Sequence, residues 1–168
     1  MLIFNSDGTN NTRFFDGASW VADDFSTPVG HQIIYPGTGF TYSAGDAAAK
    51  LVFSGDVKTT KTAIHIYGGA STINIVGPPY PSADTRLVTT SLASTLVPYA
   101  DGFTVYTNDG TMSVTPGAGF YLTDGTDILD DTFTPLSPSA TDKMFRNRGI
   151  ILGSLSGDRI WVVNSPIP

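Results

Sequence analysis

Four carboxylates lie close together in the stretch DGTDILDD, which covers residues 124–131. They are Asp124, Asp127, Asp130 and Asp131. Hard cations such as Ca²⁺ bind clustered carboxylates on a loop, so these four are the candidate metal ligands of the chain. The stretch has neither the ligand spacing of an EF-hand nor a Glu. The favoured interpretation is therefore a solvated turn in which Asp side chains cap backbone N–H groups.

The remaining titratable residues match no catalytic motif. His31 and His65 are the only histidines, and His65 lies within the alternating segment 62–67. Asp23 and Asp24 are adjacent, but paired carboxylates hydrolyse glycosides only when a cleft holds them several ångströms apart. The sequence contains no H-E-x-x-H and no G-x-S-x-G. We therefore predict no catalytic residues, no cofactor and no enzymatic activity.

The segments YPGTGFTY (35–42) and TPGAGFYL (115–122) repeat one turn motif at an offset of 116 − 36 = 80 residues. In each, Pro sets φ at the second position of a turn and Gly supplies the positive φ of a type II turn. The second Gly stands where a strand restarts, which predicts a bulge or a close backbone approach, and Phe then anchors the strand. The residues concerned are Pro36, Gly37, Gly39 and Phe40, and then Pro116, Gly117, Gly119 and Phe120. Neither copy has the Lys-Ser/Thr of a phosphate-binding loop.

The composition is typical of short strands joined by many tight turns. The 168 residues include 18 Gly and 11 Pro, and only 14% are charged, against roughly 25% in an average soluble domain. A net charge of −6 disfavours nucleic acid as a partner, and no apolar run approaches the roughly 20 residues that cross a bilayer. The lack of Cys excludes a disulfide scaffold. The first residues lack the pattern of a secretory signal, so we expect synthesis without Sec export or removal of a leader.

Alternation with a period of two predicts strands along most of the chain. The predicted strands are HQIIY (31–35), KLVF (50–53), TAIHIY (62–67), TINIV (72–76), FTVYT (103–107), GFYL (119–122) and RIWVV (159–163). Turn residues separate them, and Asn-Asp-Gly at 108–110 predicts a hairpin. Short helical turns are expected only in GDAAAK (45–50), SLASTLV (91–97) and SATDKMF (139–145). The predicted fold is all-β and antiparallel, sandwich- or barrel-like, with two related β halves.

The offset of 80 extends beyond the glycine motif. The further matched pairs are Gly30 with Gly110, Gly45 with Gly125, Phe53 with Phe133 and Ser54 with Thr134. An internal duplication explains these matches, and chance convergence on good turn chemistry is the alternative. We predict a first β unit over residues 1–81, a packed connector over 82–102 and a second β unit over 103–168. The two units either share one core or form two lobes in contact.

The aromatic residues divide into a predicted core set and a predicted surface set. The set at strand positions, expected mostly in the core, is Trp20, Phe40, Phe53, Tyr67, Phe103, Phe120, Phe133 and Trp161. Tyr35, Tyr80 and Tyr99 lie beside turns and prolines, so we expect them to be exposed. An exposed aromatic platform on a β-sandwich could bind a sugar or a protein partner.

The first half of the chain resembles a repeat unit of large bacterial surface or secreted β proteins of unassigned activity. The resemblance is carried by FFDGASWVADDF, YPGTGFTY, LVFSGDVKTT and STINIVGPPYP within residues 13–81, with an echo at 103–135. The chain departs from the pattern at Gly77-Pro78-Pro79, where Asn-Pro is expected. The resemblance implies a β architecture, and it carries over no catalytic residue.

These observations favour a protein that works by assembly. We expect a non-enzymatic structural component of a larger particle such as a virion, either a capsid decoration (cement) protein or a tail or fibre protein. Its partners would be copies of itself, in a homo-oligomer such as a trimer, and other structural proteins, with neither nucleic acid nor membrane. The alternative is a carbohydrate-binding β-sandwich module of a bacterial surface protein, extracellular or at the cell surface. A glycosidase or lyase that uses the Asp pairs is the third hypothesis.

Overall fold

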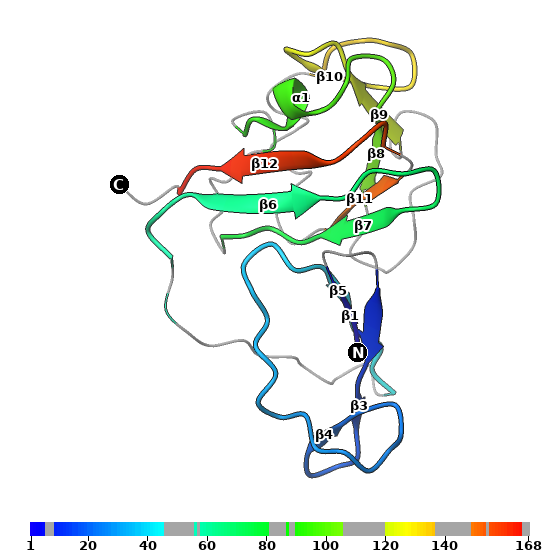
Figure 1. Cartoon of the computed structure of the whole chain (residues 1–168), viewed down its shortest axis with the longest axis vertical. Coiled ribbons are helices and arrows are strands. Elements are labelled where there is room, and N and C mark those ends of the chain that lie inside the picture. The colour runs from blue at the N-terminus through cyan, green and yellow to red at the C-terminus, as the bar shows by residue number, and fades with distance from the viewer. Residues whose placement is uncertain are drawn as a thin grey trace.

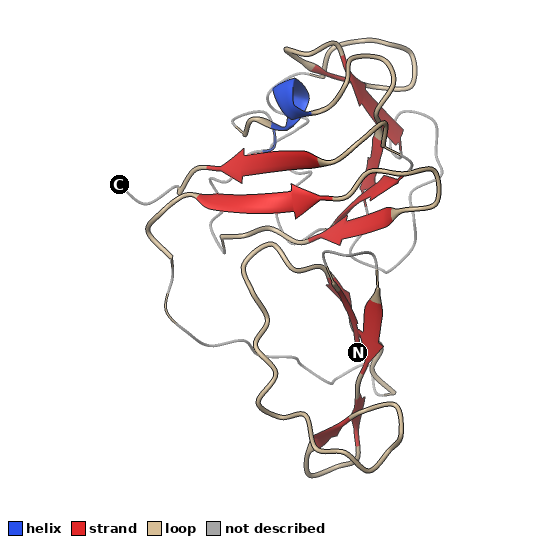
Figure 2. Cartoon of the chain, in the orientation of Figure 1, coloured by secondary structure: helices blue, strands red, loops and turns tan. Residues whose placement is uncertain are grey.

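The fold is all-β and antiparallel (Figures 1 and 2), as seen in a computed structural model. The structure describes residues 1–5, 9–45, 56, 58–80, 87, 90–105, 120–136, 149–153 and 155–165. The strands are β1 (Leu2–Phe4), β2 (Asn10–Thr12), β3 (Phe14–Phe15), β4 (Trp20–Val21), β5 (Phe40–Thr41), β6 (Thr62–Ile66), β7 (Ile73–Val76), β8 (Phe103–Val105), β9 (Phe120–Thr123), β10 (Ile128–Leu129), β11 (Ile150–Gly153) and β12 (Arg159–Val163). Helix α1 (Leu92–Thr95) is a single turn within the predicted segment 91–97.

Two antiparallel sheets form the body of the protein, in the upper part of Figure 1. One sheet has five strands in the order β10-β9-β8-β11-β7, and the other pairs β12 with β6. β6 and β7 belong to the predicted first unit, whereas their partners β12 and β11 belong to the predicted second unit. The body is therefore sandwich-like and is built by strands from both ends of the chain.

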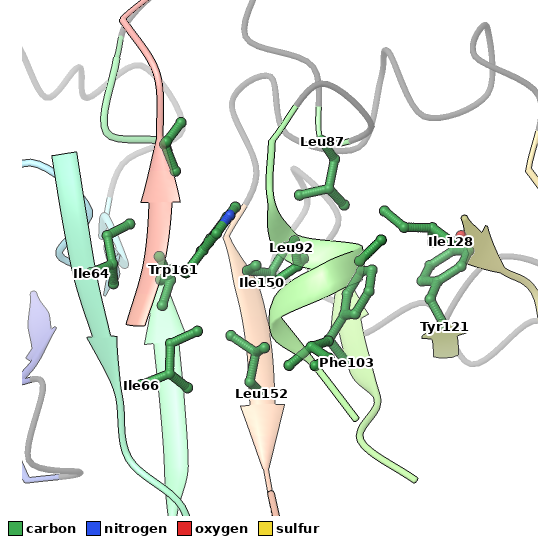
Figure 3. Packing of buried hydrophobic residues seen from close by; sticks show 14 of the residues in the cluster. Ile64, Ile66, Leu87, Leu92, Phe103, Tyr121, Ile128, Ile150, Leu152 and Trp161 are labelled. Carbon is green, nitrogen blue, oxygen red and sulfur yellow. The ribbon is translucent and has the colours of Figure 1, made fainter. Parts of the chain in front are cut away.

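One hydrophobic core lies between these sheets (Figure 3). Burial alternates along β6: Thr62, Ile64 and Ile66 are buried, whereas Ala63 and His65 are exposed. This is the alternation that the segment TAIHIY predicts for a half-buried strand.

Trp161 of β12 is fully buried near the middle of the core, and Figure 3 shows it between Ile64 and Ile150. Leu87 and Leu92, from the predicted connector, are buried in the same cluster. Burial of an apolar side chain of this size stabilises the fold by about 1.5–3 kcal/mol. The connector therefore takes part in the core that both predicted units share.

The N-terminal residues form a separate lobe below the body in Figure 1. Its sheet has the order β2-β1-β5, and the hairpin β3–β4 extends from it to the far end of the molecule. The hairpin turn places Gly17 at φ 103°, and the Asp16 carboxylate accepts the N–H of Ser19 at 2.7 Å. This is the turn chemistry that an Asp-Gly pair between two strands favours.

The first glycine motif forms the predicted turn. The Thr38 N–H donates to the Tyr35 carbonyl at 3.0 Å, and Gly37 has φ 90°, as a type II turn requires. The second motif includes Pro116, Gly117 and Gly119, which lie outside the described residues, so the duplication stays a prediction.

Gly39 makes the predicted close backbone approach, and the approach joins the lobe to the body. A Cβ atom on Gly39 would lie 2.3 Å from the carbonyl oxygen of Ile75 in β7. The Gly39 N–H donates to that oxygen at 3.2 Å, and the Gly77 N–H donates to the Gly37 carbonyl at 3.1 Å. Residues 37–39 thus cover the outer edge of β7, which only glycine permits at this distance.

Two sequence predictions are wrong, one about a strand at residues 31–35 and one about the exposure of Tyr80. Residues 31–35 do not form a strand, because none of the strands that the structure describes pairs with them. Ile33 and Tyr35 are 66% and 67% exposed. Tyr80 is buried rather than exposed, because its hydroxyl has partners in the core: it lies 3.1 Å from the Thr62 hydroxyl and donates to the Thr60 carbonyl.

Three aromatic residues expected in the core are exposed. Phe40 is 36% exposed because it begins β5, an edge strand of its sheet. Phe120 is 49% exposed because it begins β9 on the less buried face of that strand, opposite to the face of the buried Tyr121. Phe133 is 59% exposed in the turn after β10. The predicted strand 50–53 and the hairpin at 108–110 lie outside the described residues.

Candidate functional site

The acidic stretch 124–131 forms two capped turns. The Asp124 carboxylate accepts the backbone N–H groups of Thr126 and Asp127 at 2.8 and 2.7 Å. The Asp130 carboxylate accepts the hydroxyl of Thr132 at 2.6 Å and backbone N–H groups on the same turn. Among the described residues, no three His, Cys, Asp or Glu side chains are grouped so that they could hold a metal ion. The favoured turn-capping interpretation is therefore the one that these contacts support.

The same capping sets the ionisation of these acids. The N–H of Asp127, followed by that of Thr126, lowers the pKa of Asp124. The Thr132 hydroxyl, followed by the Thr134 N–H, lowers the pKa of Asp130. Hydrogen bonds to the charged form favour that form, so both side chains are carboxylates at neutral pH.

Asp16 and Asp24 in the lobe are capped in the same way. The pKa of Asp16 is lowered first by the N–H of Ser19, and that of Asp24 is lowered first by the hydroxyl of Thr27. Both carboxylate oxygen atoms of Asp24 therefore accept hydrogen bonds within its own turn. The adjacent pair Asp23–Asp24 does not resemble the two carboxylates that a glycosidase holds across a cleft.

The two histidines lie at exposed positions in different parts of the fold. His31 is exposed in the turn before residues 32–35. His65 lies on the exposed face of β6, with Nε2 3.7 Å from an Asp158 carboxylate oxygen and its ring 4.1 Å from that of Tyr67. Both His65 and Asp158 are well exposed, so the pair contributes at most about 1 kcal/mol.

A cleft of about 520 Å³ lies between the lobe and the body. The lobe contributes β1 and residues 32–38, and the body contributes parts of β6 and β7. Ile33, Ile64 and Ile75 give it an apolar lining, and Tyr35 and His65 add polar groups. Sequence analysis missed this cleft, because it depends on how residues 37–39 dock on β7.

A cluster of aromatic residues occupies the end of the lobe; we call Phe14, Phe15, Trp20 and Phe25 the lower cluster. Phe14, Phe15 and Phe25 are exposed, and Trp20 is half-buried. The rings of Phe14 and Phe25 are stacked with centroids 4.4 Å apart, and those of Phe15 and Trp20 lie 5.6 Å apart. All four come from the hairpin β3–β4 or the turn that follows it, at the lower end of Figure 1.

A second aromatic pair lies at the other end of the long axis; we call Tyr99 and Phe133 the upper pair. Their ring centroids are 6.3 Å apart. Tyr99 follows α1 and Phe133 follows β10, and both elements lie at the upper end of Figure 1.

The lower cluster and the upper pair share an unusual backbone feature. Among the described residues, Phe25, Tyr99 and Phe133 are the non-glycine residues with positive φ, at 56°, 57° and 61°. The left-handed conformation costs a residue with a side chain roughly 1–2 kcal/mol. All three side chains are about 60% exposed or more, so little burial offsets this cost. Their local contacts are the backbone hydrogen bonds of their turns and the ring pairs described above. Backbone strain of this kind at exposed residues points to a functional role.

Asp101 is a buried acid that sequence analysis missed. It is 1% exposed and accepts the N–H groups of Val97 and Ser156, each at 2.9 Å, with Arg159 3.7 Å away. Ser156 and Arg159 lie more than 50 positions after Asp101 in the chain. Asp101 ties the segment after α1 to the turn before β12, which is a structural role.

Comparison with protein-family models, curated proteins and solved structures finds no match to the chain. In the part of the chain that the structure describes, no helix has the length and apolar character needed to cross a membrane. The fold and its surface therefore define a sandwich-like β protein that presents aromatic residues at two ends.

Proposed function

We propose that the chain is a non-enzymatic structural protein that acts by assembly, as a capsid decoration, tail or fibre component of a particle such as a virion. The observation that carries the proposal is the display of Phe25, Tyr99 and Phe133 in a strained backbone conformation at exposed turns. Burial of these rings against a neighbouring subunit would offset the strain, because aromatic side chains dominate the energetics of interfaces.

The placement of the aromatic residues suits contacts at two ends. The lower cluster and the upper pair lie at opposite ends of the long axis (Figure 1). Two different surfaces on one subunit make a head-to-tail contact, which closes into a ring or continues as a filament. A trimer is the ring that we expect.

A carbohydrate-binding module is the second candidate, because aromatic rings such as the exposed Phe15 and the half-buried Trp20 beside it also stack on sugars. A sugar site needs free polar groups beside its aromatic platform. Next in sequence to residues of the lower cluster, the carboxylates of Asp16 and Asp24 already accept hydrogen bonds from their own turns. This arrangement favours a protein partner over a glycan.

The experiment is light scattering across a dilution series on the wild-type chain and on the double variant Phe25→Gly/Phe133→Gly. Glycine accepts the left-handed backbone at both positions, so the fold should be retained. We expect a defined oligomer for the wild type, a monomer for the double variant, and no change for the control Ile73→Thr, which alters an exposed apolar residue of β7.

Two results would contradict the proposal. One is a wild-type chain that stays monomeric at every concentration and binds no shell or filament. The other is a double variant that assembles as the wild type does. A glycan array tests the second candidate, and binding that Trp20→Ala abolishes would favour it.

A further inference from the structure

The backbone groups of β6 can be assigned to its two sides from the hydrogen bonds at its ends. The Tyr67 N–H donates to the Asn74 side-chain oxygen at 2.9 Å, and the Tyr67 carbonyl accepts from the Asn74 amide at 2.8 Å. Both backbone groups of Tyr67 thus point away from β12. In an antiparallel ladder the direction alternates residue by residue, so Ala63 and His65 point the same way as Tyr67.

The partner strand gives the same assignment independently. The N–H and the carbonyl of Val162 both bond to the Ser91 hydroxyl, at 3.3 and 3.0 Å, and so point away from β6. Val162 is the register partner of Ala63. The pair Ala63–Val162 is therefore a non-hydrogen-bonded pair, and by alternation the pair His65–Ile160 is one too.

Ala63 and His65 therefore direct two N–H donors and two carbonyl acceptors towards the cleft, which both residues line. No backbone or side-chain partner for these four groups occurs among the residues that the structure describes. They lie one strand repeat apart, about 7 Å along β6, which is the spacing at which an antiparallel strand pairs.

The edge of the neighbouring strand β7 is already hydrogen-bonded to the extended backbone of residues 37–39. Gly37 and Gly39 pair with β7, and the Asn74 amide occupies the last position of the β6 edge, at Tyr67. The stretch at Ala63 and His65 continues this paired edge and is the part left open. An open edge is a template for another strand.

We propose that an extended arm of another polypeptide chain adds to β6 in this cleft as an antiparallel strand. Four hydrogen bonds to Ala63 and His65 would hold it, in the manner of β-augmentation. The lobe forms the opposite wall of the cleft, so a single extended segment fits this description better than the edge of a whole sheet. The proposal rests on the proposed assembly function and specifies how one partner would bind.

The cleft also indicates the chemistry of the arm. Ile33, Ile64 and Ile75 line it, so alternate residues of the arm are apolar and β-branched. Lys61 is exposed immediately before β6, where the C-terminal end of an antiparallel arm would lie. An acidic residue at that end of the arm complements Lys61.

The experiment measures amide hydrogen exchange by NMR on the full chain, diluted until it is monomeric. The probe is a blocked hexapeptide, Thr-Val-Thr-Ile-Val-Asp. Without the probe, we expect fast exchange at Ala63 and His65 and slow exchange at Ile64, which pairs with Trp161. With the probe at about ten times its Kd, exchange at Ala63 and His65 should slow about tenfold, and exchange at Ile64 should not change.

Two variants separate the backbone from the side chain. Ala63→Pro removes the N–H that faces the cleft and leaves the β12 ladder intact, so it should abolish probe binding. Ala63→Val keeps that N–H and should bind as the wild type does. Slow exchange at Ala63 and His65 before the probe is added would overturn the proposal, as would a millimolar probe that protects neither amide. A wild-type chain that is monomeric at every concentration but still binds the probe would refute the end-to-end assembly and would leave the strand addition at β6 supported.

Discussion

The substitution Gly39→Ala tests whether the lobe is held to the body by a backbone approach that only glycine permits. The new Cβ would lie 2.3 Å from the carbonyl oxygen of Ile75 and 2.6 Å from its carbonyl carbon, whereas ordinary contact is 3.4–4 Å. Both nearest atoms are backbone atoms, so no rotamer change relieves the clash. The two backbones must move apart by about 1 Å or more.

That movement breaks the hydrogen bonds Gly39–Ile75 and Gly77–Gly37, which measure 3.2 and 3.1 Å. Each contributes about 1 kcal/mol net, and loss of both gives an expected decrease of about 2–3 kcal/mol in the free energy of unfolding. Urea denaturation followed by circular dichroism measures this decrease. Amide exchange at Gly77 should rise in parallel, because its acceptor moves away.

Gly30→Ala is the matched control. A Cβ on Gly30 would meet nothing within 4 Å, and Gly30 does not adopt a positive φ. The change should be neutral or stabilise the protein by up to about 1 kcal/mol, through the unfolded state. If Gly39→Ala stays within about 0.5 kcal/mol of the Gly30→Ala variant, the steric account of the motif is wrong.

Two further predictions concern the acids. Asp101→Ala removes the acceptor of the Val97 and Ser156 N–H groups and leaves Arg159 without its neighbour, so thermal or urea unfolding should show a loss of about 3 kcal/mol; a loss below about 1 kcal/mol would contradict the structural role. The capped acids Asp24 and Asp130 have pKa values below their unfolded-state values. Their contribution to the free energy of unfolding is therefore present above the unfolded-state pKa of about 4, and it is lost as the pH falls through the folded pKa values. Urea unfolding between pH 2 and pH 7 should show this decline, and the variant Asp24→Asn should show less of it.

Local chemistry was predictable from the sequence. The positive φ of Gly37 and the close approach of Gly39 follow from the order Pro-Gly-x-Gly, and the alternation of TAIHIY fixes which residues of β6 are buried. These features depend on residues within a few positions of one another, so a short stretch of sequence contains their cause.

Long-range pairing could not be predicted in the same way. β7 pairs with β11, whose residues lie more than 70 positions further along the chain, and no local pattern specifies that partner. The burial of Tyr80 depends on the Thr62 hydroxyl, and that of Asp101 depends on Ser156. A polar residue beside a turn is exposed on average, and it is buried only where distant segments supply its hydrogen bonds.

The cleft follows from the same backbone geometry as the glycine motif. Because residues 37–39 dock on β7, the lobe closes that edge and leaves the stretch of β6 at Ala63 and His65 uncovered beside it. A lobe that docked one residue further along would meet backbone groups that point the other way, since the direction of backbone groups alternates along a strand. Gly37 and Gly39 therefore act through the backbone geometry that they permit. They determine which strand edge is satisfied within the chain and which edge is left for a partner.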